Sequence, residues 1–325
     1  MKLPIYQWFI YIALLIVGFC GGYAIAIYGA EESVPIDVRE FNTKYHYINP
    51  LLACGDENFS GLQNDATNSL RNSLEELIQK KENESSVVDG AVYIRPFNGG
   101  PWLGINYETM FTPGSLLKVP LIMSVYKHAE REPGFLEKKI LFEGGAVPAV
   151  EYFSSIEIHP GQTYSVEDLV KAVLIDSDNN AAVLLTQLIS HDELRDSYSQ
   201  LGIEEPAFGE DYSMTVRTYA SFFRILYNAT YIDHDASEHL LAVLGQATFD
   251  KGLVAGVPNG VVVAHKFGER QLQGQEGVQL HDCGIVYAKN PYLICVMLRG
   301  SNLDTLAGVI AEISKKVYES VAAKK

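Results

Sequence analysis

Apolar and polar positions along the chain predict a helix near each end of its folded part. From about Asn64, apolar residues recur at the spacing of one helix face, and residues 303–321 show the same period. The first stripe consists of Ala66, Leu70, Leu74, Leu77 and Ile78, and the last of Leu306, Ile310, Ile313, Val317 and Val321. Each predicted helix therefore has one apolar face that must be covered.

Strand patterns lie between these two helices in the sequence. Residues 87–95 and 102–107 are separated by Phe97-Asn-Gly-Gly100, a hairpin signal because Asn-Gly supplies the positive φ angles of a tight turn. Three more strands are predicted later in the chain, at 260–267, 284–287 and 292–298. Together these strands are enough for one antiparallel sheet.

The chain between the two groups of strands is predicted to be largely helical. An apolar helix begins near Ser115, and residues 131–244 contain further helices. These further helices are expected at 166–176, 181–189 and 216–227. The fold class is therefore α/β (α+β), an antiparallel sheet flanked by terminal helices with 131–244 as a helical lobe. A cleft between the sheet and the lobe is where an active site is expected.

Residues 3–30 are predicted to be a single-pass membrane helix. They contain no charged side chain and are long enough to cross a hydrocarbon core of about 30 Å. Lys2 before this run, and Glu31 and Glu32 after it, predict a cytoplasmic N-terminus with the rest of the chain extracytoplasmic. A cleaved signal sequence, ending at the small-x-small pattern Ala24–Ala26, is the alternative. The predicted organisation is a membrane anchor at 1–30, a connector at 31–63 and one domain at 64–325.

Composition and charge exclude some functions. A net charge of -15 over 325 residues, without a basic stripe, argues against a nucleic-acid partner. No Cys/His spacing indicates a zinc site, so we expect neither a metal nor another cofactor. Cys283 and Cys295 flank a predicted turn, which leaves a disulfide or two buried thiols open, and we favour the thiols.

Ser115 and Lys118 are the first candidates for catalysis. They lie at i and i+3, so one face of the predicted helix carries both side chains. A serine hydroxyl becomes a nucleophile when a base removes its proton, and lysine is such a base when burial and nearby positive charge lower its pKa. Ser115 is thus the candidate nucleophile and Lys118 its base. The backbone N–H of Ser115 lies at a helix start, where it can point at a developing oxyanion.

Two further motifs follow in the sequence. Ser177-Asp178-Asn179 occupies the polar break between two lobe helices, and Lys266-Phe267-Gly268 lies on the first strand after the lobe. Each has a structural explanation by itself, because serine and asparagine often cap helices and lysine often protects a sheet edge. Taken together, the three motifs indicate one site.

With Ser115-x-x-Lys118, these motifs make the chain resemble class A β-lactamases and low-molecular-mass penicillin-binding proteins. That family carries Ser-x-x-Lys, Ser-Asp-Asn and Lys-Thr-Gly. The resemblance covers about residues 64–323, and it includes GQTYSVEDL at 161–169 and HDCGIVY at 281–287. It implies a serine enzyme that forms an acyl-enzyme with β-lactams or related wall peptides.

The resemblance also implies a role for each motif residue. Ser177 would pass a proton to the leaving nitrogen, Asn179 would hold the amide carbonyl of the substrate, and Lys266 would face its carboxylate. The backbone N–H of Glu269 would be the second oxyanion donor, and Gly268 would let an extended substrate approach the strand.

The chain departs from the family pattern in two places. Phe267 replaces a threonine or serine whose hydroxyl normally binds the substrate carboxylate, although in a strand its ring can face the core instead. Glu269 would repel that carboxylate unless its side chain turns away or binds a cationic group. The stretch 201–211 is short, and Glu205 within it is the candidate base for deacylation by water.

Three functions fit these features. A β-lactamase-like hydrolase is supported by the sequence around the motifs. A D-alanyl-D-alanine carboxypeptidase or transpeptidase with slow deacylation is supported by the short 201–211 stretch and the predicted anchor. A non-catalytic module that binds wall peptides or β-lactams is supported by Phe267. We favour a membrane-anchored serine hydrolase of the class A β-lactamase type.

Overall fold

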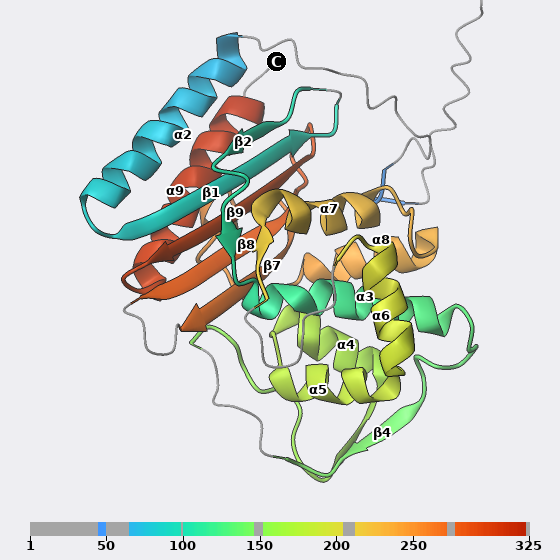
Figure 1. The fold of residues 1–325 in the computed structure, drawn as a ribbon. Helices are drawn as coiled ribbons and strands as arrows, with labels where there is room; N and C mark the ends of the chain where they lie inside the picture. The colour runs from blue at the N-terminus through green and yellow to red at the C-terminus, as the bar shows by residue number, and fades with distance from the viewer. Residues whose placement is uncertain are drawn as a thin grey trace, which may run out of the picture. The chain divides into compact units, whose positions relative to one another are not determined.

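Five strands form the central sheet of the computed structural model, in the order β2-β1-β9-β8-β7, and each neighbouring pair is antiparallel (Figure 1). The strands are Val87–Pro96 (β1), Leu103–Ile105 (β2), Val263–Gln271 (β7), Val278–Val286 (β8) and Tyr292–Gly300 (β9). The structure describes residues 45–49, 65–98, 100–145, 152–203, 212–271 and 277–322. The chain divides into two units, and all described residues belong to the larger one, which comprises 43–50 and 54–325. The predicted sheet and fold class are confirmed.

The two terminal helices, α2 (Asp65–Asn83) and α9 (Leu303–Ala322), cover one face of the sheet (Figure 1). Their apolar stripes share one buried cluster with the strands, and this cluster includes Leu74 of α2, Ile310 of α9 and Val296 of β9. Burying a side chain of this kind typically contributes about 1.5–3 kcal/mol. The helical periods predicted from the sequence therefore correspond to the faces that pack on the sheet.

The helical lobe lies on the other side of the sheet. Its helices are α3 (Lys118–Ala129), α4 (Val166–Ile175), α5 (Asn179–Leu188), α6 (His191–Gln200), α7 (Val216–Tyr227) and α8 (His234–Leu244). Tyr219 and Phe222 of α7 are fully buried in a second cluster, together with Ala91 and Met297 of the sheet. Two short strand pairs complete the lobe, β3 (Met110–Phe111) with β6 (Met214–Thr215) and β4 (Lys139–Phe142) with β5 (Gln162–Ser165). Helix α7 thus connects the lobe to the sheet.

Strand β8 is longer than predicted. The apolar pattern indicated 284–287, but the strand begins at Val278. His281 and Asp282 interrupt the pattern, yet both are fully buried because their side chains are hydrogen-bonded inside the protein. Buried polar residues of this kind hide a strand from a prediction based on apolar alternation.

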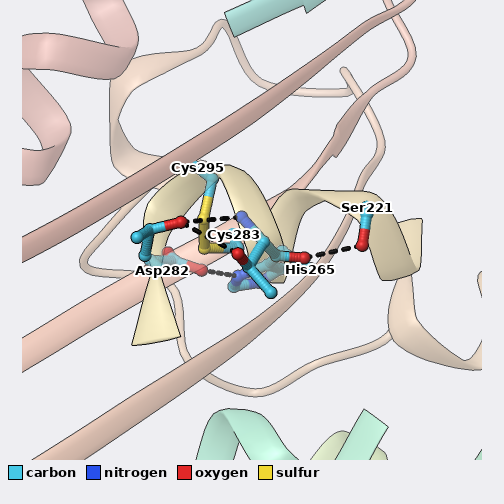
Figure 2. Close-up of a disulfide and its surroundings, with 7 residues drawn as sticks. Ser221, His265, Asp282, Cys283 and Cys295 are labelled. Carbon is cyan, nitrogen blue, oxygen red and sulfur yellow. Dashed lines mark hydrogen bonds and ion pairs between the residues drawn. A yellow bond between two sulfur atoms is a disulfide. The ribbon is translucent and has the colours of Figure 1, made fainter. Parts of the chain in front are cut away.

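Cys283 and Cys295 form a disulfide, so the favoured prediction of two buried thiols is wrong (Figure 2). The two cysteines are direct partners in the register of β8 and β9, and their Cα atoms are 4.0 Å apart. The turn between the strands was predicted, but the register that places the thiols opposite each other was not. Figure 2 also shows His265 and Asp282, which occupy neighbouring positions on β7 and β8.

Part of the predicted connector packs on the lobe. The backbone N–H groups of His46, Tyr47 and Ile48 donate hydrogen bonds to the carboxylate of Glu238 on α8, at 2.5, 2.7 and 2.8 Å. The predicted anchor at 1–30 lies outside the described residues. Within the part of the chain that the structure describes, no helix is long and apolar enough to cross a membrane.

Candidate active site

Two glycines let the predicted nucleophile lie against strand β7. Ser115 is in a short 3-10 helix, Gly114–Leu117, which continues directly into α3. Gly114 has a φ of +54°, and a Cβ atom there would lie 2.7 Å from the carbonyl oxygen of Glu269. A Cβ atom on Gly268 would lie 2.6 Å from the carbonyl oxygen of Pro113. Only glycine allows both close approaches, so these two positions bring Ser115 to β7.

The ammonium group of Lys118 is surrounded by oxygen atoms. Its Nζ lies 3.0 Å from Ser115 Oγ, 2.6 Å from the Ser177 carbonyl oxygen, 3.0 Å from Ser177 Oγ and 2.6 Å from Asn179 Oδ1, so these four acceptors share the three N–H groups of the ammonium. Lys118 and Ser115 are both buried. The i and i+3 spacing therefore gives the predicted contact between the two side chains, and the same lysine connects Ser115 to the second motif.

Ser177 lies in a turn that Asp178 holds in place. Ser177 has a φ of +60°, an uncommon value for a residue other than glycine. The buried carboxylate of Asp178 caps α5 by accepting a hydrogen bond from the Ala181 N–H, and it also accepts from the N–H groups of Glu157 and Ile158. Asp178 thus fixes the turn that directs Ser177 and Asn179 toward Lys118.

Lys266 reaches the same cluster from β7. Its side chain is fully buried, and its Nζ donates to Ser177 Oγ at 2.9 Å and to the Phe267 carbonyl oxygen at 2.8 Å. The Nζ atom also lies 4.1 Å from the centre of the Phe267 ring, within the range of a cation–π contact. Ser177 Oγ therefore accepts hydrogen bonds from both Lys118 and Lys266, which places the three motifs in one site.

Phe267 faces the core on the α2 and α9 side of the sheet. Its side chain is 1% exposed, and its ring centre lies 4.6 Å from that of Phe249 and 6.5 Å from that of Phe153. Lys266, one position earlier on the strand, faces the lobe, as the alternation of a strand requires. The residue that departs from the family pattern thus serves as a core residue here.

Glu269 lies on the same face of β7 as Phe267. Its side chain is buried, and its Oε1 accepts a hydrogen bond from the Phe153 N–H at 2.8 Å. Its carbonyl oxygen is the atom that a Cβ on Gly114 would meet. Glu269 is therefore next to the nucleophile through its backbone, while its carboxylate binds the segment before α4.

Among the predicted site residues, Ser115, Lys118, Ser177, Asn179 and Lys266 are joined by hydrogen bonds into one cluster. Gly268 and Glu269 contact the segment of the nucleophile, as described above. Glu205 lies outside the described residues, so its place relative to Ser115 stays a prediction.

The model of the beta-lactamase enzyme family matches residues 69–321, which is more than half of the chain. The chain belongs to this family. It is a serine hydrolase of the β-lactamase type. A search of curated proteins finds no relative that matches.

Solved structures share the β-lactamase fold with this chain. The TLA-1 extended-spectrum β-lactamase is 20% identical, with a TM-score of 0.68 over 79% of this chain and 100% of that one. A β-lactamase from Chitinophaga pinensis DSM 2588 is 19% identical, with a TM-score of 0.68 over 78% and 99%. A mutant of PBP-A, solved as an acyl-enzyme complex with penicillin G, is 18% identical, with a TM-score of 0.64 over 78% and 96%. The fold is thus common to β-lactamases and PBP-A.

His281 supports the nucleophile of this β-lactamase family member, although the sequence analysis gave it no role. It is fully buried on β8, and its Nε2 lies 3.0 Å from the carbonyl oxygen of Thr112, three residues before Ser115. Burial lowers the pKa of His281 to about 4, so the imidazole is neutral at pH 7. A carbonyl oxygen only accepts hydrogen bonds, so Nε2 carries the hydrogen. The one sequence signal for His281 was its place in the HDCGIVY stretch at 281–287, which contributed to the family resemblance.

A small cavity of about 270 Å³ opens beside the nucleophile. Its lining consists of Gly114, Ser115, Leu117, Lys118, Leu121, Asn179 and Tyr198. Tyr198 comes from α6 and was not predicted as a site residue. A larger cavity of about 820 Å³ lies elsewhere in the lobe, and its lining includes Tyr126, Glu167 and His239 but none of the predicted site residues. The chemistry described above therefore belongs to the smaller cavity.

Proposed function

We propose that this protein forms an acyl-enzyme on Ser115 with β-lactams or related wall peptides. The observation that carries the proposal is the buried hydrogen bond between Lys118 Nζ and Ser115 Oγ, at 3.0 Å. This distance is within reach for proton transfer from a nucleophile to its base. Lys266 brings a second positive charge to Ser177 Oγ, and a nearby positive charge favours the neutral amine that Lys118 needs to act as a base.

In the proposed acylation, Ser115 Oγ attacks the carbonyl carbon of the substrate while its proton passes to Lys118 Nζ. The backbone N–H groups of Ser115 and Glu269 are the proposed donors to the oxyanion that develops. The C–N bond then breaks, and the leaving nitrogen takes a proton from the Ser177 hydroxyl, which regains one from Lys118. The product is an ester on Ser115 and a free amine, with the proton balance restored.

The hydrogen bonds of Ser177 fit this role as a proton donor. A hydroxyl group has two lone pairs and one hydrogen. Lys118 and Lys266 both donate to Ser177 Oγ, so the two lone pairs are in use and the hydroxyl hydrogen is left to donate. A substrate nitrogen next to Ser177 is the acceptor that the proposal assigns to this hydrogen.

The amide group of Asn179 fits the role of a substrate holder. Its Oδ1 accepts a hydrogen bond from Lys118 Nζ, which orients the side chain so that its NH₂ group faces elsewhere. An NH₂ group donates only, so it suits a carbonyl oxygen of the substrate. This agrees with the role that the family resemblance implies for Asn179.

The fate of the acyl-enzyme separates two activities of this site. We assign Glu205 as the base that activates water, in which case the ester is hydrolysed and the protein is a β-lactamase. A D-alanyl-D-alanine carboxypeptidase or transpeptidase with slow deacylation is the second candidate, favoured by the short 201–211 stretch and by the shared fold with PBP-A. Both candidates require the same acylation of Ser115.

A time course with a β-lactam tests the proposal. The full chain, purified in detergent, is incubated with a fluorescent penicillin and followed by intact mass for several hours, with Ser115→Ala as control. We expect one covalent adduct in the wild type and none in the variant. An adduct that disappears indicates a β-lactamase, and one that persists indicates a peptidase. The absence of an adduct under all conditions would favour the non-catalytic binding module and contradict the proposal.

We further propose that residues 3–30 anchor the protein, with the catalytic domain extracytoplasmic. The support is the uncharged run of 3–30 with Lys2 before it and Glu31 after it. Membrane fractions washed with alkaline carbonate should retain the protein, and protease added outside spheroplasts should degrade residues 64–325. Release by carbonate, or full protection from the protease, would contradict this placement.

A further inference from the structure

We propose that Gln279 and His281 on β8 are positioning residues for acyl transfer. Together they bind both backbone polar groups of Thr112, and they thereby set where the nucleophile lies. The inference rests on the acyl transfer proposed at Ser115, and it adds two residues that act on that site through the backbone. Neither side chain belongs to the three sequence motifs.

Thr112 links two elements of secondary structure. Strand β3 ends at Phe111, which is also the last residue of its pairing with β6, and the 3-10 helix of Ser115 begins at Gly114. The backbone N–H and carbonyl groups of such a linking residue need partners from elsewhere in the fold. Three residues of chain, at most about 10 Å, separate Thr112 from the nucleophile. A partner that fixes Thr112 therefore restricts Ser115 as well.

Two buried side chains of β8 are these partners. The Thr112 N–H donates to Gln279 Oε1 at 3.1 Å, and His281 Nε2 donates to the Thr112 carbonyl oxygen at 3.0 Å. Gln279 is 1% exposed, and His281 is fully buried. They are two positions apart on one strand, so both point to the same face as Cys283, which belongs to the cluster that faces the lobe. We call this pair of hydrogen bonds the Thr112 clamp.

The residue before Thr112 is held by the same face of the sheet. The buried ring of Phe111 makes a T-shaped contact with His281, with ring centres 5.5 Å apart. The guanidinium group of Arg299 on β9 lies 5.4 Å from the centre of the Phe111 ring. Arg299 is the register partner of Gln279, and it forms an ion pair with Asp89 on β1. These ring contacts add to the clamp, because Phe111 cannot turn without losing them.

The clamp acts on the same short stretch that meets β7. His281 is the register partner of Gly268, and a Cβ atom on Gly268 would lie 2.6 Å from the carbonyl oxygen of Pro113. Two adjacent strands therefore fix residues 112 and 113, and one of these strands carries Lys266. A displacement of about 1 Å at a reacting group typically costs about 10²-fold in rate. We therefore expect the clamp to act on the rate of acylation.

Saturation kinetics test the role of Gln279. The full chain in detergent at pH 7 is mixed with increasing concentrations of a fluorescent penicillin, and adduct formation gives the rate at saturation and the half-saturating concentration. Gln279→Met keeps the length of the side chain but removes the acceptor. We expect its saturated rate to fall about 10- to 100-fold, with the half-saturating concentration within about twofold of the wild type.

Gln279→Glu is the conservative variant on the N–H side of the clamp. It keeps an oxygen that can accept the Thr112 N–H. Its register partners, Arg270 and Arg299, are cations that favour the added negative charge. Its saturated rate should lie within about threefold of the wild type. Recovery by this variant separates the hydrogen bond from the rest of the glutamine side chain.

His281 is tested on the carbonyl side of the clamp. His281→Leu removes the donor, and its saturated rate should fall at least about tenfold. His281→Gln keeps a donor for the Thr112 carbonyl oxygen, and its saturated rate should lie within about threefold of the wild type. A residue that only packed in the core would not show this difference between leucine and glutamine.

Leu280→Val is the matched control. Leu280 lies between the two clamp residues on β8, is fully buried, and belongs to the cluster on the α2 and α9 side. The change loosens the same strand without touching Thr112, so the saturated rate should equal that of the wild type. Urea unfolding of each variant measures the accompanying change in stability. If Gln279→Met does not fold, Gln279→Asn replaces it with the same expected loss of rate, since the shorter side chain withdraws the oxygen from Thr112.

The outcomes separate this inference from the proposed function. An unchanged saturated rate in Gln279→Met or in His281→Leu would overturn the inference and leave acyl transfer intact. So would a change in the half-saturating concentration alone, a loss of rate that Leu280→Val shares, or a failure of Gln279→Glu and His281→Gln to recover the rate. The absence of an adduct in the wild type would instead overturn the proposed function, and the inference with it.

Discussion

At the scale of single residues, Ser177 is the centre of the site, because its side chain contacts both lysines. Its positive φ of +60° is a strained conformation for serine, of the order of 1–3 kcal/mol. The three backbone N–H groups that bind the Asp178 carboxylate offset this cost. The Asp178 carboxylate therefore stabilises the strained backbone conformation of Ser177 through these hydrogen bonds. This gives the aspartate in the middle of the motif a structural role.

Lys118→Ala should slow acylation of Ser115 by a factor of about 10² to 10⁴, the usual contribution of a general base. The rate of adduct formation, followed by mass spectrometry with excess β-lactam, measures the effect. Lys127→Ala is the control, since Lys127 is on the same helix and forms an ion pair with Glu130 away from the site. Equal rates in wild type and Lys118→Ala would remove Lys118 from the mechanism.

His281 should make the fold less stable in mild acid. Burial lowers its pKa to about 4 in the folded protein, whereas the unfolded chain has the ordinary value of 6.5. Below pH 6.5 the unfolded state therefore binds a proton that the folded state does not, so stability is lost as the pH falls from 6.5 toward 4. The loss from this group amounts to about 3 kcal/mol at most.

Urea unfolding at pH 7 and pH 4, in wild type and His281→Gln, measures this loss. Glutamine can still donate a hydrogen bond to the Thr112 carbonyl oxygen but does not titrate. The free energy of unfolding should fall more between the two pH values in the wild type than in the variant. The same fall in both proteins would contradict the assigned cause.

At the scale of elements, three neighbouring strands place Lys266 and the two disulfide cysteines in one row across the sheet. Lys266 on β7 is the register partner of Cys283 on β8, which in turn is the partner of Cys295 on β9. All three side chains are buried, and the two cysteines belong to the cluster that faces the lobe. The disulfide therefore lies directly beside the lysine that contacts Ser177.

The disulfide should be formed in the isolated protein. Alkylation in denaturant without reductant should modify Cys20 and Cys54 but leave Cys283 and Cys295 unmodified. Their separation of 12 residues predicts that the double variant Cys283→Ala/Cys295→Ala loses about 3 kcal/mol of unfolding free energy, in the chain-entropy account. Modification of all four cysteines would contradict the pairing.

Gly268→Ala should separate β7 from the segment of the nucleophile. The new Cβ would lie 2.6 Å from the Pro113 carbonyl oxygen and 2.9 Å from the Leu116 nitrogen, so one element must move. A displacement of about 1 Å at a reacting group typically costs about 10²-fold in rate, which is the loss of acylation that we expect.

Gly308→Ala is the control for this substitution. Gly308 lies in α9, and its added Cβ would meet nothing within 4 Å. The change should leave acylation unaffected and raise the unfolding free energy by about 1 kcal/mol through helix propensity. Acylation by Gly268→Ala at the rate of this control would show that the close approach is not needed.

At the scale of the whole molecule, the sequence predicted the order of elements and the residues of the main cluster. The helical periods of α2 and α9 and the turn signals could be recognised because each depends only on residues close together in the sequence. The site could be predicted because its three motifs occur in a fixed order. What the sequence did not predict depends on long-range packing. Buried His281 and Asp282 hid the first two thirds of β8, and the register of β8 with β9 decided the disulfide. The contact of Glu269 with Phe153 joins residues that are 116 positions apart in the sequence.

The location of the acyl group tests the central claim most directly. Ser177 contacts both lysines and is the rival nucleophile, and tryptic cleavage after Lys118 and Lys171 places the two serines on different peptides. Digestion of the penicillin adduct, followed by fragmentation of the labelled peptide, identifies the modified residue. We predict that the acyl group is on Ser115 alone. An acyl group on Ser177, or one that is retained in Ser115→Ala, would contradict the account.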